Sequence, residues 1–368
     1  MKIGIMGSRG IPNQYGGFEQ FAEYLSIGLL QKGHEVFVYN SSLHPYKKVE
    51  WNSVHIIHSK DWENRLGTAG QFLYDRNCIR DALKRNFDVL LHLGYTSDSI
   101  WHKQWPKNSV NIVNMDGLEW KRTKYNKIVK KFLKKAELLA ANHADVLVAD
   151  SPEIQKYLFE KYGKSSVYIP YGATVFETPD TESLKRVKLQ PHFYYLMIAR
   201  IEPENNLETV IKGCHLSKSD FPLVIVGNIN NKYGRYLQSK YAATKTIFLN
   251  GIYDQEILNN LRYFSSIYFH GHSVGGTNPS LLEAMACNCY VVAHNNHFNR
   301  SVLENEGEYF KNPVDISEII NDSKNEMIIH RWKKTNEERI RTKYNKHKVI
   351  DRYEEQMLMS LKKKYDKN

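Results

Sequence analysis

The sequence predicts an α/β protein in which two doubly wound, Rossmann-like domains face a central cleft. The chain has 368 residues, which exceeds one typical core and suits two. Short apolar strands alternate with helical stretches, as in parallel sheets covered on both faces. The pattern restarts once, after a hinge near residues 171–190. We therefore expect an N-terminal domain at 1–172, a second domain at 173–345, and a C-terminal helix with a basic tail at 346–368.

The strands are recognised as short apolar runs. In the first domain we expect them at Lys2–Gly7, Glu35–Asn40, Val54–His58, Asp88–Gly94, Val110–Asn114 and Val146–Asp150. After the short run Val167–Pro170, further strands are expected at Tyr194–Ala199, Leu223–Gly227, Ile247–Asn250, Ile267–His270 and Tyr290–Ala293. Apolar residues at helical spacing predict helices that include Phe18–Lys32, Asn206–Cys214 and Pro279–Cys287. Ligands of such sheets bind at the carboxyl ends of the strands, so the loops there are the candidate sites.

Charge and cysteine content limit the partners and the compartment. The formal net charge of +11 favours an anionic partner, which could be nucleic acid, acidic lipid or a phosphorylated substrate. The four cysteines have neither zinc spacing nor the pattern of a disulfide framework, so we expect a reducing, cytoplasmic compartment. The sequence opens directly on a strand, and no apolar run reaches transmembrane length. Any membrane contact is therefore expected to be peripheral.

A glycine-rich turn follows the first strand, in the segment GSRGIPNQYGGFE. Gly16 and Gly17 stand just before a helix, where glycine permits close approach and free amides attract an anion. The spacing is not that of the dinucleotide-binding fingerprint. A plain loop with turn glycines is the alternative interpretation.

A second turn, HGHSVGGTNPSLLEAM, follows the strand that ends at His270. Its Gly275, Gly276 and Thr277 precede Asn278, a good N-cap, and Pro279 suits the first helical position. The helix start can hold a diphosphate, and Glu283 is placed to accept hydrogen bonds from ribose hydroxyls. The alternative is a glutamate that the helix dipole favours.

Arg200 stands at the carboxyl end of the first strand of the second domain, in the segment ARIEPENN. A guanidinium there can bind a diphosphate leaving group. The alternative is an ion pair with Glu202 or Glu204.

Together with NMDGLEWKR, these three segments resemble the retaining GT-B glycosyltransferases of family four, and more narrowly the rhamnosyltransferase-like branch of bacterial polysaccharide assembly. The motifs cover nearly the whole chain, in order. The resemblance implies transfer of a sugar, in this branch L-rhamnose from a dTDP donor, to a lipid-linked saccharide. It implies no cofactor beyond the nucleotide-sugar donor, and no D-x-D metal motif is present, so we expect no metal site.

The resemblance also assigns roles to individual residues. Gly16 and Gly17 would face the donor phosphates and the acceptor, and Arg200 would bind the diphosphate and act in catalysis. Glu283 would bind the ribose, and the amides of Gly275–Asn278 would add to the donor site. Asp116 is the second catalytic candidate, because the broad family places a histidine or an acid at the end of this strand.

Two positions depart from the broad family. Its first paired glutamate falls on Gly275 and its diphosphate-binding lysine on Asn205. The missing lysine leaves less positive charge for a diphosphate, and both changes suggest a different contact to the donor sugar. A non-catalytic nucleotide-sugar-binding protein therefore stays open as an alternative, as does a nucleotide-sugar epimerase with the same two-domain cleft.

Residues 121–135, KRTKYNKIVKKFLKK, carry eight positive charges and no negative one. Ile128, Val129, Phe132 and Leu133 give this expected helix an apolar stripe. A basic amphipathic helix is typical of proteins that lie on anionic membranes, here the inner face of the cell membrane. The alternative is a solvated helix packed on its domain. No nucleic-acid motif accompanies the charge, so we expect no nucleic-acid partner.

Overall fold

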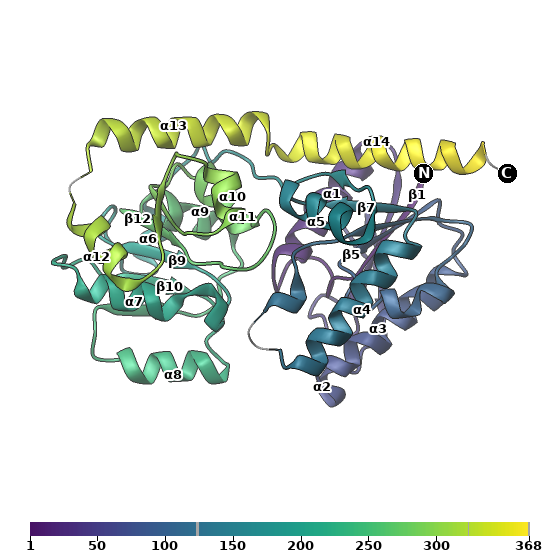
Figure 1. Cartoon of the computed structure of the whole chain (residues 1–368), viewed down its shortest axis with the longest axis horizontal. Coiled ribbons are helices and arrows are strands. Elements are labelled where there is room, and N and C mark those ends of the chain that lie inside the picture. Colours follow the sequence, from purple (N-terminus) through teal and green to yellow (C-terminus); the bar gives the residue numbers. More distant parts are fainter. Residues whose placement is uncertain (123–124, 323, 367–368) are drawn as a thin grey trace. The chain divides into compact units, whose positions relative to one another are not determined.

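The computed structural model describes residues 1–122, 125–322 and 324–366, which form two compact units (Figure 1). The first unit contains Met1–Lys121, Tyr125–Tyr171 and the chain from Lys346 onward. The second contains Arg122 and Gly172–Asn345. Each unit holds one mainly parallel sheet with helices packed against it. The predicted pair of Rossmann-like sheets is therefore confirmed.

The sheet of the first unit has the order β3-β4-β2-β1-β5-β6-β7-β8 within the described residues. Its strands are β1 (Lys2–Met6), β2 (Glu35–Ser41), β3 (Glu50–Trp51), β4 (Val54–Ser59), β5 (Val89–Leu93), β6 (Val110–Asn114), β7 (Val146–Ala149) and β8 (Val167–Tyr168). Among the strands that the structure describes in this sheet, β3 alone runs antiparallel, against β4. β1 pairs with both β2 and β5, so the strand order reverses beside β1. Reversal points of this kind are where ligands of open α/β sheets bind.

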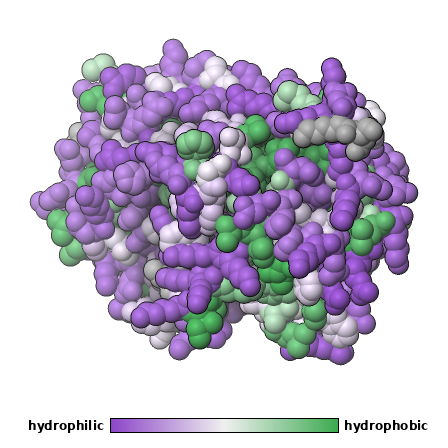
Figure 2. All heavy atoms as spheres, turned by 45° about the vertical axis from the view of Figure 1, so that its right-hand side comes forward, coloured by the Kyte–Doolittle hydropathy of each residue, from purple (hydrophilic) through white to green (hydrophobic). Residues whose placement is uncertain are grey.

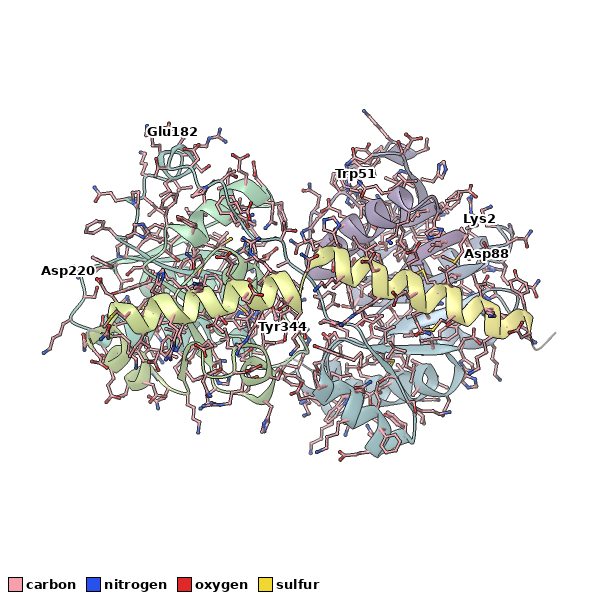
Figure 3. The ribbon with its side chains drawn as sticks, turned by 90° about the horizontal axis from the view of Figure 1, so that it is seen from above. Lys2, Trp51, Asp88, Glu182, Asp220 and Tyr344 are labelled. Carbon is pink, nitrogen blue, oxygen red and sulfur yellow. The ribbon has the colours of Figure 1, made fainter. Side chains whose placement is uncertain are left out.

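The amino ends of β1 and β5 are fixed to each other. The backbone N–H of Lys2 donates to Asp88 Oδ2 at 2.6 Å, and Figure 3 labels both residues at this edge. The loops that leave the carboxyl ends of the same strands therefore lie at the opposite end of these strands.

Helices of the first unit cover both faces of its sheet. They are α1 (Gly17–Gln31), α2 (Glu63–Leu66), α3 (Thr68–Ala82), α4 (Lys127–His143), α5 (Pro152–Tyr162) and α14 (Lys346–Tyr365), with short 3-10 turns η1 (Ser99–Gln104) and η2 (Glu119–Lys121). α14 lies along α1 (Figure 1), and Lys32 Nζ is 2.8 Å from Glu354 Oε2. A Cβ at Gly28 would lie 2.3 Å from Ile350 Cδ1, so glycine permits this close packing.

The sheet of the second unit has the order β11-β10-β9-β12-β13-β14 in the described chain. Its parallel strands are β9 (Tyr195–Ile198), β10 (Leu223–Val226), β11 (Thr246–Leu249), β12 (Ile267–His270), β13 (Val291–His294) and β14 (Glu308–Phe310). β9 pairs with both β10 and β12, so the order reverses beside β9. The switch point of this unit is therefore the carboxyl end of β9 and β12.

The helices of the second unit are α6 (Glu182–Lys185), α7 (Leu207–Leu216), α8 (Lys232–Tyr241), α9 (Gln255–Tyr263), α10 (Pro279–Ala286), α11 (His297–Leu303), α12 (Pro313–Asn321) and α13 (Glu326–Thr342), with the 3-10 turn η3 (Pro203–Asn205). α10 and α13 pack against each other (Figure 1). Leu207, Val210 and Ile211 of α7 are fully buried in one apolar cluster with Ile225 and Phe269 of the sheet.

The basic stretch 121–135 is not one helix, which corrects the prediction. Lys121 ends η2, and α4 begins only at Lys127. Asn126 sets that start, because its side-chain oxygen accepts from the N–H of Val129 at 3.0 Å and caps the helix. Lys124, one of the predicted basic positions, lies outside the described residues. Strands β3 and β14 were also not predicted, since two or three residues carry too little periodicity.

The surface of the protein is mixed in hydropathy, and its thiols lie in the interior. On the face drawn in Figure 2, hydrophilic side chains predominate and hydrophobic ones form separate patches. The four cysteines are free and buried. Among the helices of the described chain, none combines the length and the apolar character needed to cross a bilayer.

Candidate functional site

Two loops of the second unit, after β9 and after β12, interlock at the switch point. Asn206 Nδ2 donates to the carbonyl of Gly271 at 2.8 Å, and Ser273 Oγ donates to the carbonyl of Glu204 at 2.7 Å. A Cβ at Gly271 would lie 2.0 Å from the carbonyl oxygen of Asn205, so only glycine permits this approach. The segments ARIEPENN and HGHSVGGTNPS, which are distant in sequence, therefore form one surface.

The predicted glycine turn leads into α10 as expected. Gly275 has φ +141°, a conformation that favours glycine, and a Cβ there would meet nothing within 4 Å. Asn278 caps α10, because its Oδ1 accepts from the N–H of Ser280 at 3.0 Å, and Pro279 follows at the first helical position. Gly276 lines a small hollow with Gly275 and Asn278, while Thr277 is buried. The turn thus offers an open backbone beside the positive end of a helix dipole.

Glu283 lies one turn into α10 and is fixed from α9. It accepts hydrogen bonds from Arg262 Nη2 and from Gln255 Nε2, the latter at 3.2 Å, and its side chain is 12% exposed. Arg262 is 1% exposed. Burial is the largest single effect and lowers the pKa of this guanidinium, but Glu283, together with Tyr268 and two nearby cysteines, leaves the pKa raised. A helix dipole alone therefore does not account for Glu283, which is held in an ion pair with its edge towards solvent.

Arg200 is exposed and lies two residues after the end of β9. Its carbonyl accepts from Asn205 Nδ2 at 2.7 Å and from the N–H of Glu202 at 2.8 Å, which fixes the turn behind it. The carboxylates of Glu202 and Glu204 each lie 3.6 Å from Nη1 of Arg122, which belongs to the same unit. Asn205 thus fastens the loop at the position where the broad family has a lysine.

Two histidines at this edge were not predicted. The rings of His270 and His272 stack with centroids 4.5 Å apart. Burial, followed by the charges of His272 and His294, holds the pKa of His270 well below its usual value. His270 ends a predicted strand and His272 lies in the motif just after it, and neither position gives a distinct sequence signal.

A second hollow of about 820 Å³ opens at the other end of this sheet, beside Tyr195, Ile267 and Tyr290. These residues begin or precede β9, β12 and β13. None of the predicted site residues lines it, so the candidate site stays at the carboxyl ends of the strands.

In the first unit, the glycine turn after β1 is ordered by its own side chains. Asn13 Oδ1 accepts from the N–H of Gly16 at 3.1 Å, and the guanidinium of Arg9 pairs with Glu63 at 2.7 Å. Gly16 has an extended backbone, and a Cβ there would meet only Glu19 Oε2, at 3.7 Å. Gly17 begins α1. The fold therefore does not require glycine at position 16, which favours a close approach by a ligand.

Asp116 follows β6 in a left-handed conformation, with φ +43°. Its N–H donates to Asn114 Oδ1 at 3.0 Å, and its negative charge contributes to raising the pKa of Tyr95 and Tyr171, after the larger effect of burial. Positive φ costs energy for a non-glycine residue and is common at functional positions. Asp116 thus shares the carboxyl edge of the first sheet with the glycine turn.

A buried acidic group at the same sheet was also not predicted. Asp75 of α3 accepts from Ser97 Oγ, while Asp98 contacts Nδ1 of the buried His92. Burial, then the charge of Asp98, raises the pKa of Asp75 to about 8. The residues come from α3, β5 and the loop after it, so no local pattern indicated them. No group of His, Cys, Asp and Glu within the described ranges is arranged to hold a metal ion.

The face of α4 is only partly apolar. Leu133 is buried, and Phe132 packs edge-on against Phe72 with centroids 5.4 Å apart. Ile128 is 80% exposed. Lysines 127, 131, 134 and 135 are exposed around it. The stripe therefore packs largely on its own unit, and the solvent face is basic with one prominent apolar residue.

Comparison with known proteins links the two units to different families. Residues 1–174 match a domain of unknown function, DUF1972, and residues 180–346 match the group 1 glycosyl transferases. A search of curated proteins found no match.

Several solved structures share the fold. Sucrose-phosphate synthase from Thermosynechococcus elongatus aligns with a TM-score of 0.79 at 13% identity, over 97% of this chain and 98% of that chain. HepE from Anabaena, in complex with UDP-glucose, aligns with 0.76 at 12% identity, over 97% and 99%. WaaG, a glycosyltransferase involved in lipopolysaccharide biosynthesis, aligns with 0.72 at 10% identity, over 96% and 98%. These likenesses establish a GT-B fold.

Proposed function

We propose that this chain, whose second unit carries a group 1 glycosyltransferase domain on a GT-B fold, moves a sugar from a nucleotide donor to a lipid-linked saccharide in polysaccharide assembly. The donor we favour is dTDP-L-rhamnose, on the motif resemblance to the rhamnosyltransferase-like branch. We propose a retaining transfer without a metal ion, in which Arg200 and the amides of Gly275–Asn278 stabilise the departing diphosphate.

The observation that carries the proposal is the arrangement around α10. An open glycine turn precedes the helix N-terminus, and Glu283, one turn later, is held by Arg262 and Gln255 with its edge exposed. Amides at a helix start suit a diphosphate, and a fixed carboxylate suits vicinal hydroxyls. A nucleoside diphosphate presents these two groups in this order. HepE, with the same fold, was solved with UDP-glucose, which agrees with such a ligand.

The first experiment is a panel of nucleotide sugars tested by thermal shift, followed by transfer assays with the best binder. Arg200→Ala should then lower turnover by about 10²-fold or more, because its charge favours the leaving diphosphate. Lys212→Ala, at an exposed pair with Glu208 on α7, is a matched control that should keep turnover. Wild-type turnover in Arg200→Ala would contradict this role.

The same assays separate the two alternative functions. A binding protein of this fold would give a thermal shift without any turnover. An epimerase would convert the nucleotide sugar to its epimer with no acceptor present. Transfer that requires an acceptor supports the proposal against both.

We also propose that α4 places the protein peripherally on the inner face of the cell membrane. Lys127, Lys131, Lys134 and Lys135 are exposed on one helix, and each basic residue near an anionic surface contributes on the order of 1 kcal/mol. Ile128 adds shallow insertion. This position would suit a lipid-linked acceptor.

Vesicle sedimentation tests the membrane proposal. Binding to anionic vesicles should weaken as salt rises, since the Debye length is only about 8 Å at physiological ionic strength, and neutral vesicles should not bind. Replacing these four lysines by glutamine should abolish sedimentation and spare nucleotide binding. The charge-matched control replaces four lysines of α13 and α14 by glutamine, among them Lys362 and Lys363. Sedimentation of the α4 variant at the wild-type level would exclude this surface.

A further inference from the structure

His272 is a side chain at the candidate donor site to which the function proposed above gives no role. It lies two residues after β12 and lines the small hollow formed with Gly275, Gly276 and Asn278. Its ring stacks on that of His270, and its Nδ1 is buried with no hydrogen-bond partner in the part of the chain that the structure describes. Buried polar atoms in native proteins are normally paired, so an orphan at a loop of this kind calls for a ligand or a proton.

The charges around His272 come from several elements. Arg200 follows β9, and Arg122 lies against Glu202 and Glu204 of the η3 turn. Burial, then Arg200 and then Arg122, lowers the pKa of His272 to about 3. His270 of β12 stacks on the ring, and burial, followed by His272 and His294 of β13, holds its pKa well below the usual value. In the free protein, His272 is therefore a neutral imidazole beside two guanidinium groups.

We propose that His272 contacts the diphosphate of the donor and takes up a proton from solvent when the nucleotide binds. The inference rests on the proposed function, since it requires a nucleoside diphosphate at this loop. The negative diphosphate opposes the two effects that keep the imidazole neutral: it offsets the charges of Arg200 and Arg122, and it supplies an acceptor for the new N–H. With Asn205 at the lysine position, His272 would provide positive charge that the fixed cations lack.

The same contact would assist transfer. When the bond between the sugar C1 and the diphosphate oxygen breaks, the electron pair stays on the diphosphate, while the acceptor oxygen bonds to C1 and its proton passes to the diphosphate and then to water. A protonated His272 would stabilise the charge that develops on the leaving group. His272 would then return its proton to solvent as the nucleoside diphosphate departs.

Proton uptake on binding has a defined sign. A group whose pKa rises on binding makes affinity increase as pH falls through the raised pKa, by up to about tenfold per pH unit. The phosphates themselves titrate in the opposite direction, because they lose charge as pH falls. That contribution is the same in the wild type and in His272→Asn, so the ratio of their dissociation constants isolates the histidine.

The experiment measures dissociation constants for dTDP and UDP between pH 6 and 8 by calorimetry, in two buffers of different ionisation enthalpy. We expect the wild type to take up a proton on binding that His272→Asn does not. The dissociation constant of His272→Asn divided by that of the wild type should therefore grow as pH falls. His272→Gln provides a second uncharged side chain should the asparagine variant fold poorly, and both are checked by their melting temperatures. His330→Asn, at an exposed histidine of α13, is the matched control and should behave as the wild type.

A ratio that stays constant with pH, or buffer-independent heats in the wild type, would overturn the inference. A wild-type protein that binds neither nucleotide nor any nucleotide sugar would instead contradict the proposed function. The two failures are therefore distinguishable.

Discussion

Glu137 in the first unit is buried and Glu283 in the second is only partly buried, and the comparison separates a structural glutamate from one that is open to a ligand. Both side chains are held by a basic partner and by neutral donors. Glu137 is 1% exposed and Glu283 is 12% exposed. Five donors surround Glu137 at 2.6–3.2 Å, namely Tyr95, Trp120, Tyr157, Lys161 and Tyr162.

The difference indicates which of the two is structural. A carboxylate offers about four lone-pair sites, so five donors saturate Glu137 and leave no place for a ligand. Its donors come from three separate parts of the first unit and fasten α4 to α5. Glu283 is oriented by Arg262 and Gln255 and keeps an exposed edge at the start of α10. Burial with saturation thus marks Glu137 as structural, whereas orientation with an exposed edge is what the ribose contact proposed for Glu283 requires.

The largest expected effect concerns Glu137. Replacing it by glutamine should lower the free energy of unfolding by about 3–5 kcal/mol, because a buried hydrogen-bonded ion pair loses one partner. Urea denaturation measures this loss, and nucleotide affinity of the folded variant should stay at the wild-type value. A loss below about 1 kcal/mol would show that the five contacts do not act as a structural hub.

Glu283→Gln should weaken nucleotide binding by about tenfold or more, since a charged hydrogen bond contributes roughly 1.5–3 kcal/mol. It should also destabilise the fold, because Arg262 is 1% exposed and loses its counter-charge. Binding is measured by calorimetry well below the melting temperature.

A double variant separates the two effects of Glu283. Glu283→Gln with Arg262→Met removes the unpaired buried charge and should recover part of the stability but none of the affinity. Recovery of nucleotide affinity in the double variant would mean that Glu283 acts through the fold rather than through the ribose.

The smallest change in stability is expected at Gly16, and Gly7 of the same unit provides the contrast. Gly16→Ala should change the free energy of unfolding by less than about 0.5 kcal/mol, because its backbone is extended and its surroundings are open. Gly7→Ala should cost several times more, since Gly7 has φ +91° and a Cβ would lie 2.5 Å from the carbonyl of Leu93. If Gly16 serves a ligand, Gly16→Ala should nonetheless reduce transfer.

The sequence by itself determined the elements and their ends where local chemistry decides them. Val110–Asn114 and Ile267–His270 form strands at the predicted bounds, because short segments rich in apolar and β-branched or aromatic residues suit a sheet covered on both faces. Asn278 and Pro279 start α10 as expected, since a cap acts within one turn. The glycine turns also follow from the sequence, because few other residues fit such loops.

The tertiary structure alone decided which distant side chains meet. Arg262 and Glu283 are 21 positions apart, and the donors of Glu137 come from as far as Tyr95, 42 positions away. The same holds for the charge of Arg122 near His272, and for the burial of Leu133 of α4. Periodicity and caps depend on neighbours within one or two turns, whereas a buried charge is defined by whatever the fold packs against it. For this reason the loops of the candidate donor site could be predicted, but the buried groups packed behind them, such as Arg262, could not.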